Sequence, residues 1–279
     1  SLAENLSQNI PNGSLIGAAL DGDGDRCLLI ETTVDGARVI DGDEMADNIA
    51  RAWDSIGVTN ATMAFSIETD LSLTSSDDRF RMQVNFLECA VGDRWLSNQL
   101  SNNWIDSKHW PTIIGAEDSG HLVMASPHPE IENKWSLVGD GAATLISQLL
   151  VRALQYNNEN MSPTFKSGWK KRISISDSDR TKWTGDGKLA DSVESMIIEY
   201  FGQESCFLSR KSIEGETSLL LLSGNVNSIP ISVGIRNSGT QEKTSITLRS
   251  MEEFEGLNEL LKLIIEFLTK ELVYSSSSN

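Results

Sequence analysis

The chain has 279 residues and a formal net charge of −17 at pH 7. This excess of negative charge would repel the phosphate backbone of nucleic acids, so the composition excludes a general nucleic-acid-binding protein. Hydrophobic residues make up 39% and charged residues 23%, which is typical of folded globular proteins. No apolar run reaches the ~20 residues that a membrane-spanning helix needs. We therefore expect no membrane contact, and any anionic ligand has to be met by local cations or a metal.

The cysteines indicate a reducing environment. Cys27, Cys89 and Cys206 lie far apart in apolar runs and follow no metal-ligand spacing. Such sparse cysteines are typical of buried thiols in cytoplasmic proteins. Residues 1–13 show neither the basic nor the apolar region of a signal peptide. We therefore expect a cytoplasmic protein.

The first part of the chain predicts strands that alternate with helices. Residues 15–20 and 27–32 are short apolar runs on either side of a Gly/Asp cluster, which is typical of a strand, a tight loop and a strand. Downstream, the expected strands span 61–67, 82–87 and 112–116, and the expected helices span 42–57, 93–103 and 139–154. This alternation predicts an α/β domain over residues 41–165, with a parallel or mixed sheet and helices.

The pattern changes after residues 156–168, a polar segment that is typical of a linker. The expected strands that follow span 172–176, 206–213, 218–223, 229–235 and 245–248, and the expected helices span 187–201 and 251–272. Apolar residues recur along the last helix at the spacing of a buried face. Residues 166–279 therefore predict an α+β domain with an antiparallel sheet and helices.

The first motif that suggests chemistry is DGDGDR, residues 21–26. Asp21, Asp23 and Asp25 alternate with glycines, so their carboxylates can converge on one hard divalent cation. An EF-hand loop is excluded, because it needs Gly at its sixth position and Glu at its twelfth, where this chain has Arg26 and Thr32. An acidic surface turn is the remaining alternative.

Two further loops carry polar groups directly after expected strands. In GAEDSGH, residues 115–121, Glu117 and Ser119 are suited to hydrogen-bond vicinal sugar hydroxyls, although a polar surface loop with a structural His121 would look the same. In RNSGT, residues 236–240, an arginine, two hydroxyls and glycine-permitted N–H groups form a good phosphate cradle. Lys243 and Arg249 add positive charge nearby, and a simple turn between strands is the alternative.

In this order, DGDGDR, GAEDSGH and RNSGT resemble the metal, sugar and phosphate loops of α-D-phosphohexomutases. The resemblance covers residues 15–272 and implies a four-domain enzyme in which each domain lends one loop to a central cleft. Residues 1–40 would be the end of the second domain, 41–165 the third domain and 166–279 the fourth. The implied reaction moves a phosphoryl group between a phosphoserine and the 1- and 6-positions of a hexose, through a bisphosphate intermediate.

The resemblance also implies roles for the motif residues. Asp21, Asp23 and Asp25 would hold Mg²⁺, with Arg26 balancing their charge. Glu117 and Ser119 would bind sugar hydroxyls, and His121 would transfer a proton. The phosphate that is not being transferred would be held by Arg236, Ser238, Gly239 and Thr240, with Arg249 nearby.

The segment VGDRW, residues 91–95, resembles a stretch of phosphoglucosamine mutases. This favours an amino-sugar phosphate as the substrate, with Asp93 and Arg94 as substrate-binding residues. A helix N-terminus capped by Asp93 is the alternative interpretation.

The chain departs from the family pattern in two places. Gln241 to Lys243 stand where Glu-Pro often follows the threonine of the phosphate loop. No Ser-His-Asn-Pro segment is present, and the similar ASPHP, residues 125–129, follows the sugar loop instead of preceding the metal loop. We therefore expect the phosphoserine on an N-terminal domain outside this chain, which alone would be inactive.

Three alternatives stay open from the sequence. The chain could be a sugar-phosphate-binding protein without turnover, a Mg²⁺-dependent phosphatase, or a mutase specific for mannose or glucose phosphates. The sequence leaves the hexose and the oligomeric state undetermined.

Overall fold

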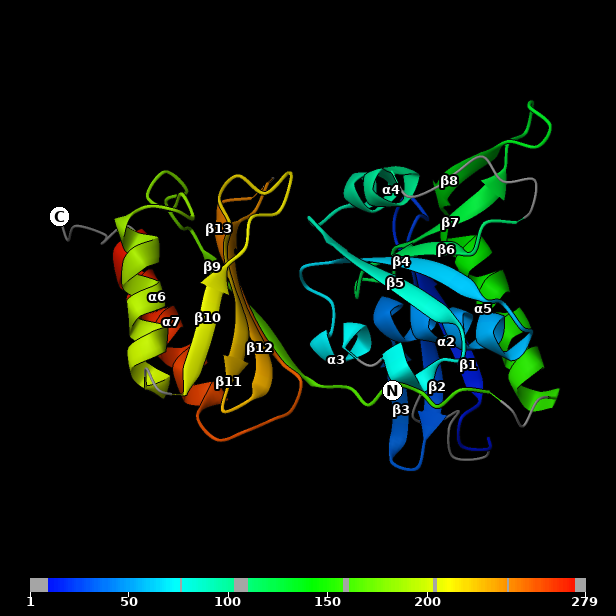
Figure 1. Ribbon diagram of the computed structural model, residues 1–279, viewed down its shortest axis with the longest axis horizontal. Helices are drawn as coiled ribbons and strands as arrows, with labels where there is room; N and C mark the ends of the chain where they lie inside the picture. The colour runs from blue at the N-terminus through cyan, green and yellow to red at the C-terminus, as the bar shows by residue number, and fades with distance from the viewer. Residues whose placement is uncertain are drawn as a thin grey trace. The chain divides into compact units, whose positions relative to one another are not determined.

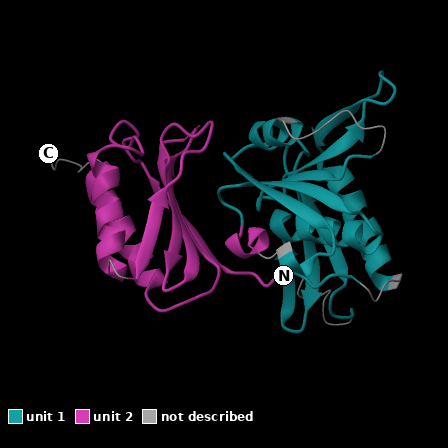
Figure 2. Ribbon diagram, in the orientation of Figure 1, with its two compact units in different colours: residues 1–69, 76–165 teal, residues 70–75, 166–279 magenta. Residues whose placement is uncertain are grey.

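The chain forms two compact units, residues 1–69 with 76–165 and residues 70–75 with 166–279 (Figure 2). The structure is a computed structural model that describes residues 10–75, 77–102, 110–157, 161–202, 205–239 and 241–273. Across these ranges, none of the helices combines the length and the apolar character that a membrane crossing requires. Each unit has its own sheets and is described by itself.

Unit 1 begins with a three-stranded antiparallel sheet in the order β1-β2-β3 (Figure 1). Its strands are β1 (Leu15–Leu20), β2 (Cys27–Thr33) and β3 (Gly36–Ile40). Leu20 pairs with Cys27, so residues 21–26 close the β1–β2 hairpin. Along β2, Cys27 and Leu29 are fully buried while the residue between them is not, as expected for a strand that packs one face on the protein interior. The DGDGDR motif is therefore the loop of a hairpin with one anchored strand.

The second sheet of unit 1 is mixed, in the order β5-β4-β6-β7-β8. β4 (Asn60–Ser66), β5 (Gln83–Cys89) and β6 (Ile113–Ala116) are parallel, whereas β7 (Leu122–Pro127) and β8 (Trp135–Gly139) are antiparallel. The helices of the unit are α2 (Gly42–Ser55), η1 (Asp77–Arg79), α4 (Asp93–Asn102) and α5 (Gly141–Asn157). The predicted α/β class is confirmed.

Helices cover both faces of this mixed sheet. Leu96 and Leu100 of α4 belong to a buried cluster that includes Val123 of β7. The next residue, Met124, points to the opposite face and contacts Ser147 of α5. α2 packs against α5 and against β6. The carboxyl ends of β4, β5 and β6 remain at one edge of the sheet, which is where open α/β sheets carry their ligand sites.

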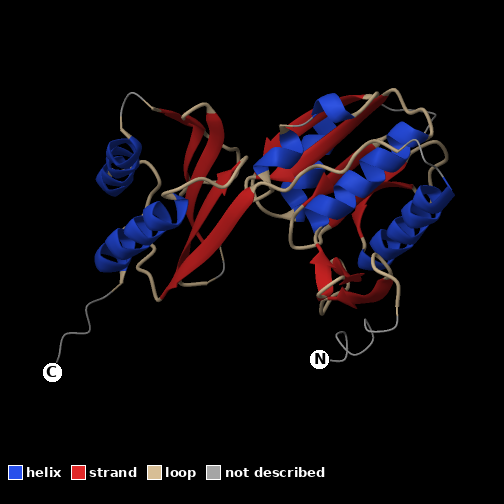
Figure 3. Cartoon of the chain, turned by 90° about the horizontal axis from the view of Figure 1, so that it is seen from below, coloured by secondary structure: helices blue, strands red, loops and turns tan. Residues whose placement is uncertain are grey.

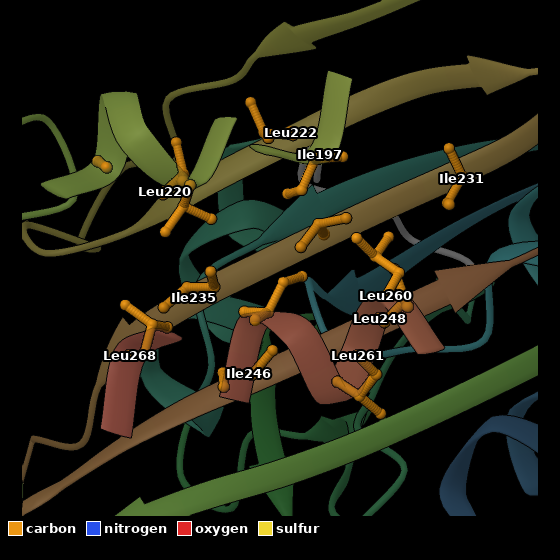
Figure 4. Close-up of a cluster of buried hydrophobic side chains, with 14 of the residues drawn as sticks. Ile197, Leu220, Leu222, Ile231, Ile235, Ile246, Leu248, Leu260, Leu261 and Leu268 are labelled. Atoms are coloured by element: carbon orange, nitrogen blue, oxygen red, sulfur yellow. The ribbon is translucent and has the colours of Figure 1, made fainter. Parts of the chain in front are cut away.

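Unit 2 is an antiparallel sheet covered on one face by two helices (Figures 1 and 3). The strand order is β10-β11-β12-β13-β9, formed by β9 (Trp169–Ser176), β10 (Cys206–Arg210), β11 (Leu220–Val226), β12 (Ile229–Asn237) and β13 (Lys243–Ser250). α6 (Lys188–Phe201) and α7 (Leu257–Leu272) pack their apolar faces on alternate residues of these strands, as Figure 4 shows for Ile197 and Leu268. The predicted α+β class is confirmed.

The last helix is shorter than its apolar pattern predicts. The expected helix covers residues 251–272, but α7 starts at Leu257. Gly256 has φ +98°, a left-handed conformation that an α-helix cannot continue through. Glycine therefore sets the N-terminal boundary of α7.

The predicted linker is held against unit 1 over part of its length. Residues 158–160 lie outside the described residues, but Arg51 of α2 donates a 2.6 Å hydrogen bond to the Ser162 carbonyl. The Ser162 hydroxyl also bonds to Asp54. In unit 2, the Gly168 N–H donates to Asp70 Oδ2 and Ser72 Oγ, both at 3.0 Å, within the short insertion that contains α3 (Leu71–Thr74). The segment that the sequence predicts as a linker therefore makes defined hydrogen bonds to unit 1 at Ser162.

Candidate metal and sugar-binding site

Three carboxylates converge in the β1–β2 hairpin loop. Asp21, Asp23 and Asp25 each offer an oxygen, and these oxygens all lie within 4.8 Å of one another. Arg26 Nε contacts Asp21 Oδ2 at 2.6 Å and Asp25 Oδ1 at 3.7 Å. The N–H groups of Gly24 and Arg26 both donate to Asp21 Oδ1 at 3.2 Å. The loop is therefore folded around Asp21, with its side chain fixed from three directions.

The electrostatics of this loop favour the ionised form of Asp21. Burial alone would raise the pKa of Asp21, but the hydrogen bonds from the Arg26 backbone and side chain outweigh it and lower this pKa to about 2. Asp25 Oδ1 is buried and accepts no hydrogen bond within the described part of the chain. A cluster of charged oxygens with an unsatisfied member is the donor set that a hard divalent cation requires. The residues therefore fit a Mg²⁺ site.

The sugar loop of the sequence prediction begins where β6 ends. The Glu117 N–H donates to the His121 carbonyl, and the Gly120 N–H donates to the Glu117 carbonyl, both at 3.0 Å. These bonds close a tight turn over residues 117–121, in which Gly120 adopts φ +91°. The turn holds Glu117 and Ser119 together, with Ser119 Oγ at 3.4 Å from Glu117 Oε2.

The Glu117 carboxyl group is buried and held by the neighbouring strand end. Burial raises its pKa, while a hydrogen bond from the Gly92 N–H to Oε1, at 2.6 Å, opposes this rise. Gly92 belongs to the VGDRW segment after β5. Two motifs that lie 25 residues apart in the sequence therefore meet in one hydrogen bond.

The metal hairpin and the sugar loop form one continuous site. Arg26 and His121 make an antiparallel backbone bridge, and the Cys27 N–H donates to the Gly120 carbonyl at 3.0 Å. His121 Nδ1 lies 3.3 Å from Asp25 Oδ2. The His121 ring is buried, and its Nε2 has no hydrogen-bond partner among the described residues. The His121 side chain thus connects the carboxylate cluster to the sugar loop.

Close backbone approaches at glycines hold this site together. A Cβ on Gly42, the first residue of α2, would lie 1.8 Å from the Glu117 carbonyl oxygen, and one on Gly120 would lie 2.3 Å from the Cys27 carbonyl oxygen. A Cβ on Gly139 would lie 2.5 Å from His121 Nε2. Only glycine permits these approaches, so the backbone itself fixes the distance between the two loops.

Substitution of Gly42 by Ala is expected to shift the sugar loop and to destabilise unit 1 by about 1–3 kcal/mol, because the new methyl group meets backbone that has no room to relax. Urea denaturation measures the loss of stability. Gly22→Ala is the matched control, since a Cβ at that position meets nothing within 4 Å. Equal stability of both variants would contradict the close approach.

Glu68 lies at the candidate site, and the sequence interpretation missed it. It follows β4 at the same sheet edge as Gly92 and Glu117, and it is 6% exposed. Its charge contributes to the raised pKa of Glu117. The rule that ligand-binding residues follow parallel strands could have identified it, because 61–67 was already an expected strand. The same edge holds Cys89, whose burial, together with the charge of Glu117, raises the pKa of its thiol to about 12.

Asp93 and Arg94 lie at the exposed start of α4. Asp93 Oδ1 accepts the Arg94 N–H at 2.6 Å, and an acidic residue in the first turn is favourable to the helix dipole. The Arg94 guanidinium lies 4.7 Å from the Trp95 ring centroid. Gly92 of this segment contacts the sugar loop through its hydrogen bond to Glu117, while substrate binding by Asp93 and Arg94 stays a prediction.

The predicted phosphate loop joins β12 to β13 in unit 2. The Ser238 N–H donates to the Lys243 carbonyl at 2.9 Å, and the Gln241 N–H donates to Ser238 Oγ at 3.3 Å. Arg236 Nη1 lies 3.9 Å from Glu216 Oε1. Gly239 has no neighbour within 4 Å of the position of a Cβ, and Thr240 lies outside the described residues.

Asn237 fixes the base of this loop, a role that the sequence interpretation missed. Its Nδ2 donates to the carbonyls of Arg180 and Trp183, both at 3.0 Å, and its Oδ1 accepts from Thr244 Oγ1 at 3.0 Å. All three partners are distant in sequence or on the next strand, so the sequence gives no local signal for it.

Arg249 does not belong with the phosphate loop. Arg236 pairs with Ser245 across the β12–β13 ladder, whereas Arg249 pairs with Ser232. Four residues along a strand correspond to roughly 13 Å, and Arg249 is buried with NH2 donating to Ser232 Oγ at 3.0 Å. Proximity in the sequence suggested a shared cradle, but the extended strand carries Arg249 away from the loop.

The sequence is similar to part of several phosphoglucosamine mutases. No family model matches the chain. The chain is 34% identical over 113 residues to a phosphoglucosamine mutase of Nitrosomonas europaea, covering 40% of this chain and 22% of that protein. It is 28% identical over 161 residues to a phosphoglucosamine mutase of Neisseria subflava, covering 58% and 31% respectively. The matches therefore span less than a third of each relative.

Solved structures match almost the whole chain. The product complex of an N-acetylglucosamine-phosphate mutase, a member of the α-D-phosphohexomutase superfamily, has a TM-score of 0.61 at 17% identity and covers 96% of this chain and 52% of that chain. A phosphoglucomutase/phosphomannomutase family protein from Burkholderia thailandensis has a TM-score of 0.54 at 15% identity, with coverages of 94% and 47%. This chain thus spans about half the length of both. The chain is therefore similar in sequence to part of the phosphoglucosamine mutases and has the fold of members of the α-D-phosphohexomutase superfamily over about half of their length.

Proposed function

We propose that this chain is the metal-, sugar- and phosphate-binding portion of a phosphohexomutase that acts on glucosamine phosphates. The observation that carries the proposal is the direct junction of the DGDGDR hairpin with the GAEDSGH loop, through the Arg26–His121 bridge and the 3.3 Å contact between His121 and Asp25. The choice of an amino sugar is supported by the VGDRW segment at Glu117 and by the relatives named phosphoglucosamine mutase.

The carboxylates of Asp21, Asp23 and Asp25 would hold the cation, with Arg26 orienting Asp21. Bound Mg²⁺ would neutralise charge on the phosphoryl group in flight. In the complete protein, the phosphoserine is expected on the part of the chain that this sequence lacks. Each transfer breaks the bond from phosphorus to the donor oxygen and forms a bond from phosphorus to the acceptor hydroxyl oxygen.

Proton transfer is proposed for His121. The acceptor hydroxyl of the sugar has to lose its proton as it attacks, and histidine is the side chain that most often acts as the base in such a step. His121 Nε2 would accept this proton, while Asp25 at Nδ1 orients the ring and stabilises its positive charge.

Substrate positioning is proposed for the remaining loops. Glu117, held by Gly92, would accept hydrogen bonds from two neighbouring sugar hydroxyls, with Ser119 beside it. Arg236, Ser238, Gly239 and Thr240 would hold the phosphate that stays on the sugar. Catalysis of this type depends on positioning and on charge neutralisation, which these groups supply.

A coupled mutase assay tests this proposal. The chain is combined with the segment of the N. europaea mutase that precedes its match to this chain, and glucosamine, mannose and glucose 1-phosphates are supplied in parallel with Mg²⁺. We expect conversion of glucosamine 1-phosphate to the 6-phosphate at the highest rate, and no conversion by the chain alone. Release of inorganic phosphate without isomerisation would contradict the proposal in favour of a phosphatase.

A further inference from the structure

Unit 2 carries a hollow of about 400 Å³ that no predicted motif explains. It is lined by Ser205, Phe207, Asn225, Asn227 and Ser228. Its volume falls within the range of about 300–1,000 Å³ that small-molecule sites occupy. The hollow lies where β12 begins, whereas the predicted phosphate loop follows the end of β12, eight residues and about 27 Å further along the strand. The hollow and the phosphate loop are therefore separate places on the unit 2 sheet.

An exposed aromatic ring forms one wall of this hollow. Cys206 and Leu208 of β10 pack into the core beneath α6 and α7, so the alternation of the strand turns Phe207 to the face of the sheet that these helices do not cover. Phe207 is 68% exposed, although burial of a phenylalanine ring is favourable. Asn225 of β11 stands directly opposite it in the β10–β11 ladder. The ring therefore lies open to solvent with an amide side chain beside it.

Backbone contacts fix the shape of the hollow. A Cβ on Gly224 would lie 1.9 Å from the Phe207 carbonyl oxygen, so only glycine lets β11 approach β10 this closely. The Asn227 N–H donates to the Ser205 carbonyl at 2.9 Å, which joins the β11–β12 turn to the segment before β10. The walls are therefore held in place without a ligand.

The β11–β12 turn contains a residue that is unfavourable for its backbone conformation. Asn227 and Ser228 have φ +50° and +69°, and they form the two-residue turn between the paired Val226 and Ile229. Positive φ at both positions is typical of a type I′ turn, whose second position favours glycine. Serine in this left-handed conformation costs stability that glycine would not. The position thus gives up stability for a hydroxyl that lines the hollow.

We propose that this hollow binds an uncharged sugar, with a pyranose ring stacked on Phe207 and its hydroxyls bonded to the surrounding amides and hydroxyls. The face of an aromatic ring carries partial negative charge and attracts the C–H groups on the face of a pyranose ring. Asparagine and serine side chains both donate and accept hydrogen bonds, as sugar hydroxyls do.

The charge of the lining selects against phosphorylated ligands. All five lining residues are neutral, and the chain has a net charge of −17. A sugar phosphate or a nucleotide would meet no cation among these residues and would be repelled by the protein as a whole. This sugar site is therefore distinct from the sugar-phosphate site of the proposed function, and it does not rest on that function.

An NMR titration of this chain with cellobiose, an uncharged disaccharide of two pyranose rings, tests the proposal. We expect saturable shifts confined to the backbone amides of residues 205–207 and 225–228. Phe207→Ala should weaken binding at least tenfold. Tyr156→Ala is the matched control, because Tyr156 is an aromatic residue of α5 that is 92% exposed; its affinity for cellobiose should equal that of the unchanged chain.

Ser228→Gly separates a binding role from a structural one. Glycine suits the left-handed turn, so this variant should unfold at a higher urea concentration than the unchanged chain. It should nevertheless bind cellobiose at least threefold more weakly, because a hydroxyl of the hollow is gone. A gain in stability with unchanged affinity would show that the hydroxyl takes no part in binding.

Four outcomes would overturn the proposal. They are the absence of saturable shifts, shifts in residues 115–121 in place of the hollow, equal effects of Phe207→Ala and Tyr156→Ala, and tighter binding of adenosine than of cellobiose, which would make the hollow a site for a nucleobase. Turnover is not measured in this titration, so each of these outcomes refutes the sugar site and leaves the proposed function standing.

Discussion

Asp23→Asn is expected to weaken Mg²⁺ binding at least tenfold and to abolish turnover in the complete mutase, with no loss of folding. Asp23 is exposed and one of three carboxylates whose oxygens lie within 4.8 Å of one another. Removal of one charge from such a set weakens the attraction for a hard cation, because charge and ligand number set the affinity. Isothermal titration calorimetry with Mg²⁺ measures the effect directly on this chain.

Asp35→Asn is the matched control for this prediction. Asp35 is also exposed, lies in the turn of the β2–β3 hairpin and changes the net charge by the same amount. It should bind Mg²⁺ like the unchanged chain. If both variants lose affinity equally, the effect reflects the general negative charge of the protein and the metal assignment fails.

Arg79→Met is expected to cost about 3–5 kcal/mol of stability, because it leaves Asp47 as an uncompensated buried charge. The Arg79 side chain is 7% exposed and forms an ion pair with Asp47, which is 0% exposed. Arg79 also lies 4.1 Å from the Phe80 ring centroid. The pair connects η1 to α2 inside unit 1, so its loss should loosen the support of the sugar loop. Urea denaturation at neutral pH measures the loss.

The pH dependence of this variant follows from Asp47. Burial raises the pKa of Asp47, and Arg79 opposes that rise. A carboxyl group whose pKa is raised in the folded state binds its proton more tightly than in the unfolded chain, so it lowers stability as the pH rises through the folded pKa. The deficit of Arg79→Met relative to the unchanged chain should therefore shrink as the pH falls toward 4.

Two further variants separate charge from packing. Arg79→Met combined with Asp47→Asn removes the buried charge and should recover much of the lost stability. Arg81→Met is the exposed control: its side chain is 61% exposed and lies 3.1 Å from Asp54, so its loss should cost less than about 1 kcal/mol. A cost for Arg81→Met as large as that for Arg79→Met would contradict the role of burial.

The local part of the site could be predicted from the sequence. The DGDGDR residues are contiguous, and a hairpin loop brings contiguous residues together whatever the rest of the fold does. The same holds for Glu117 and Ser119, which one tight turn holds together. Where the functional groups lie within a few consecutive residues, composition and strand boundaries are sufficient to predict that they come together.

The tertiary part of the site could not be predicted in this way. The hydrogen bond from Gly92 to Glu117 joins different strand ends, and the Asn237 contacts to Arg180 and Trp183 join distant segments. Arg249 shows the opposite error. It follows Arg236 by thirteen residues in the sequence, but in the β12–β13 ladder it lies opposite Ser232, whereas Arg236 lies opposite Ser245. These contacts depend on which residues of neighbouring segments stand opposite each other, and one sequence does not reveal this.

The fold classes were predictable, but several elements were not. β7 and β8 were not expected as strands, because the residues around them have an ordinary loop composition. Their antiparallel pairing makes the five-stranded sheet of unit 1 mixed. The apolar run after Gly139 predicted a helix correctly. In α5, Thr144 and Gln148 are buried while Leu149, Leu150 and Leu154 are exposed, and only the structure separates these two faces.

The most direct measurement of the central idea, that the DGDGDR hairpin and the GAEDSGH loop of unit 1 form one sugar-phosphate site, is calorimetric titration of glucosamine 6-phosphate into this chain with Mg²⁺ present. Glu117→Gln should weaken binding about tenfold or more, which corresponds to about 1.4 kcal/mol. Arg210→Met, which removes an arginine that pairs with Asp191 and Glu194 of α6, should leave the affinity unchanged. An affinity that Glu117→Gln leaves unchanged, or that Arg210→Met lowers as much, would contradict the account.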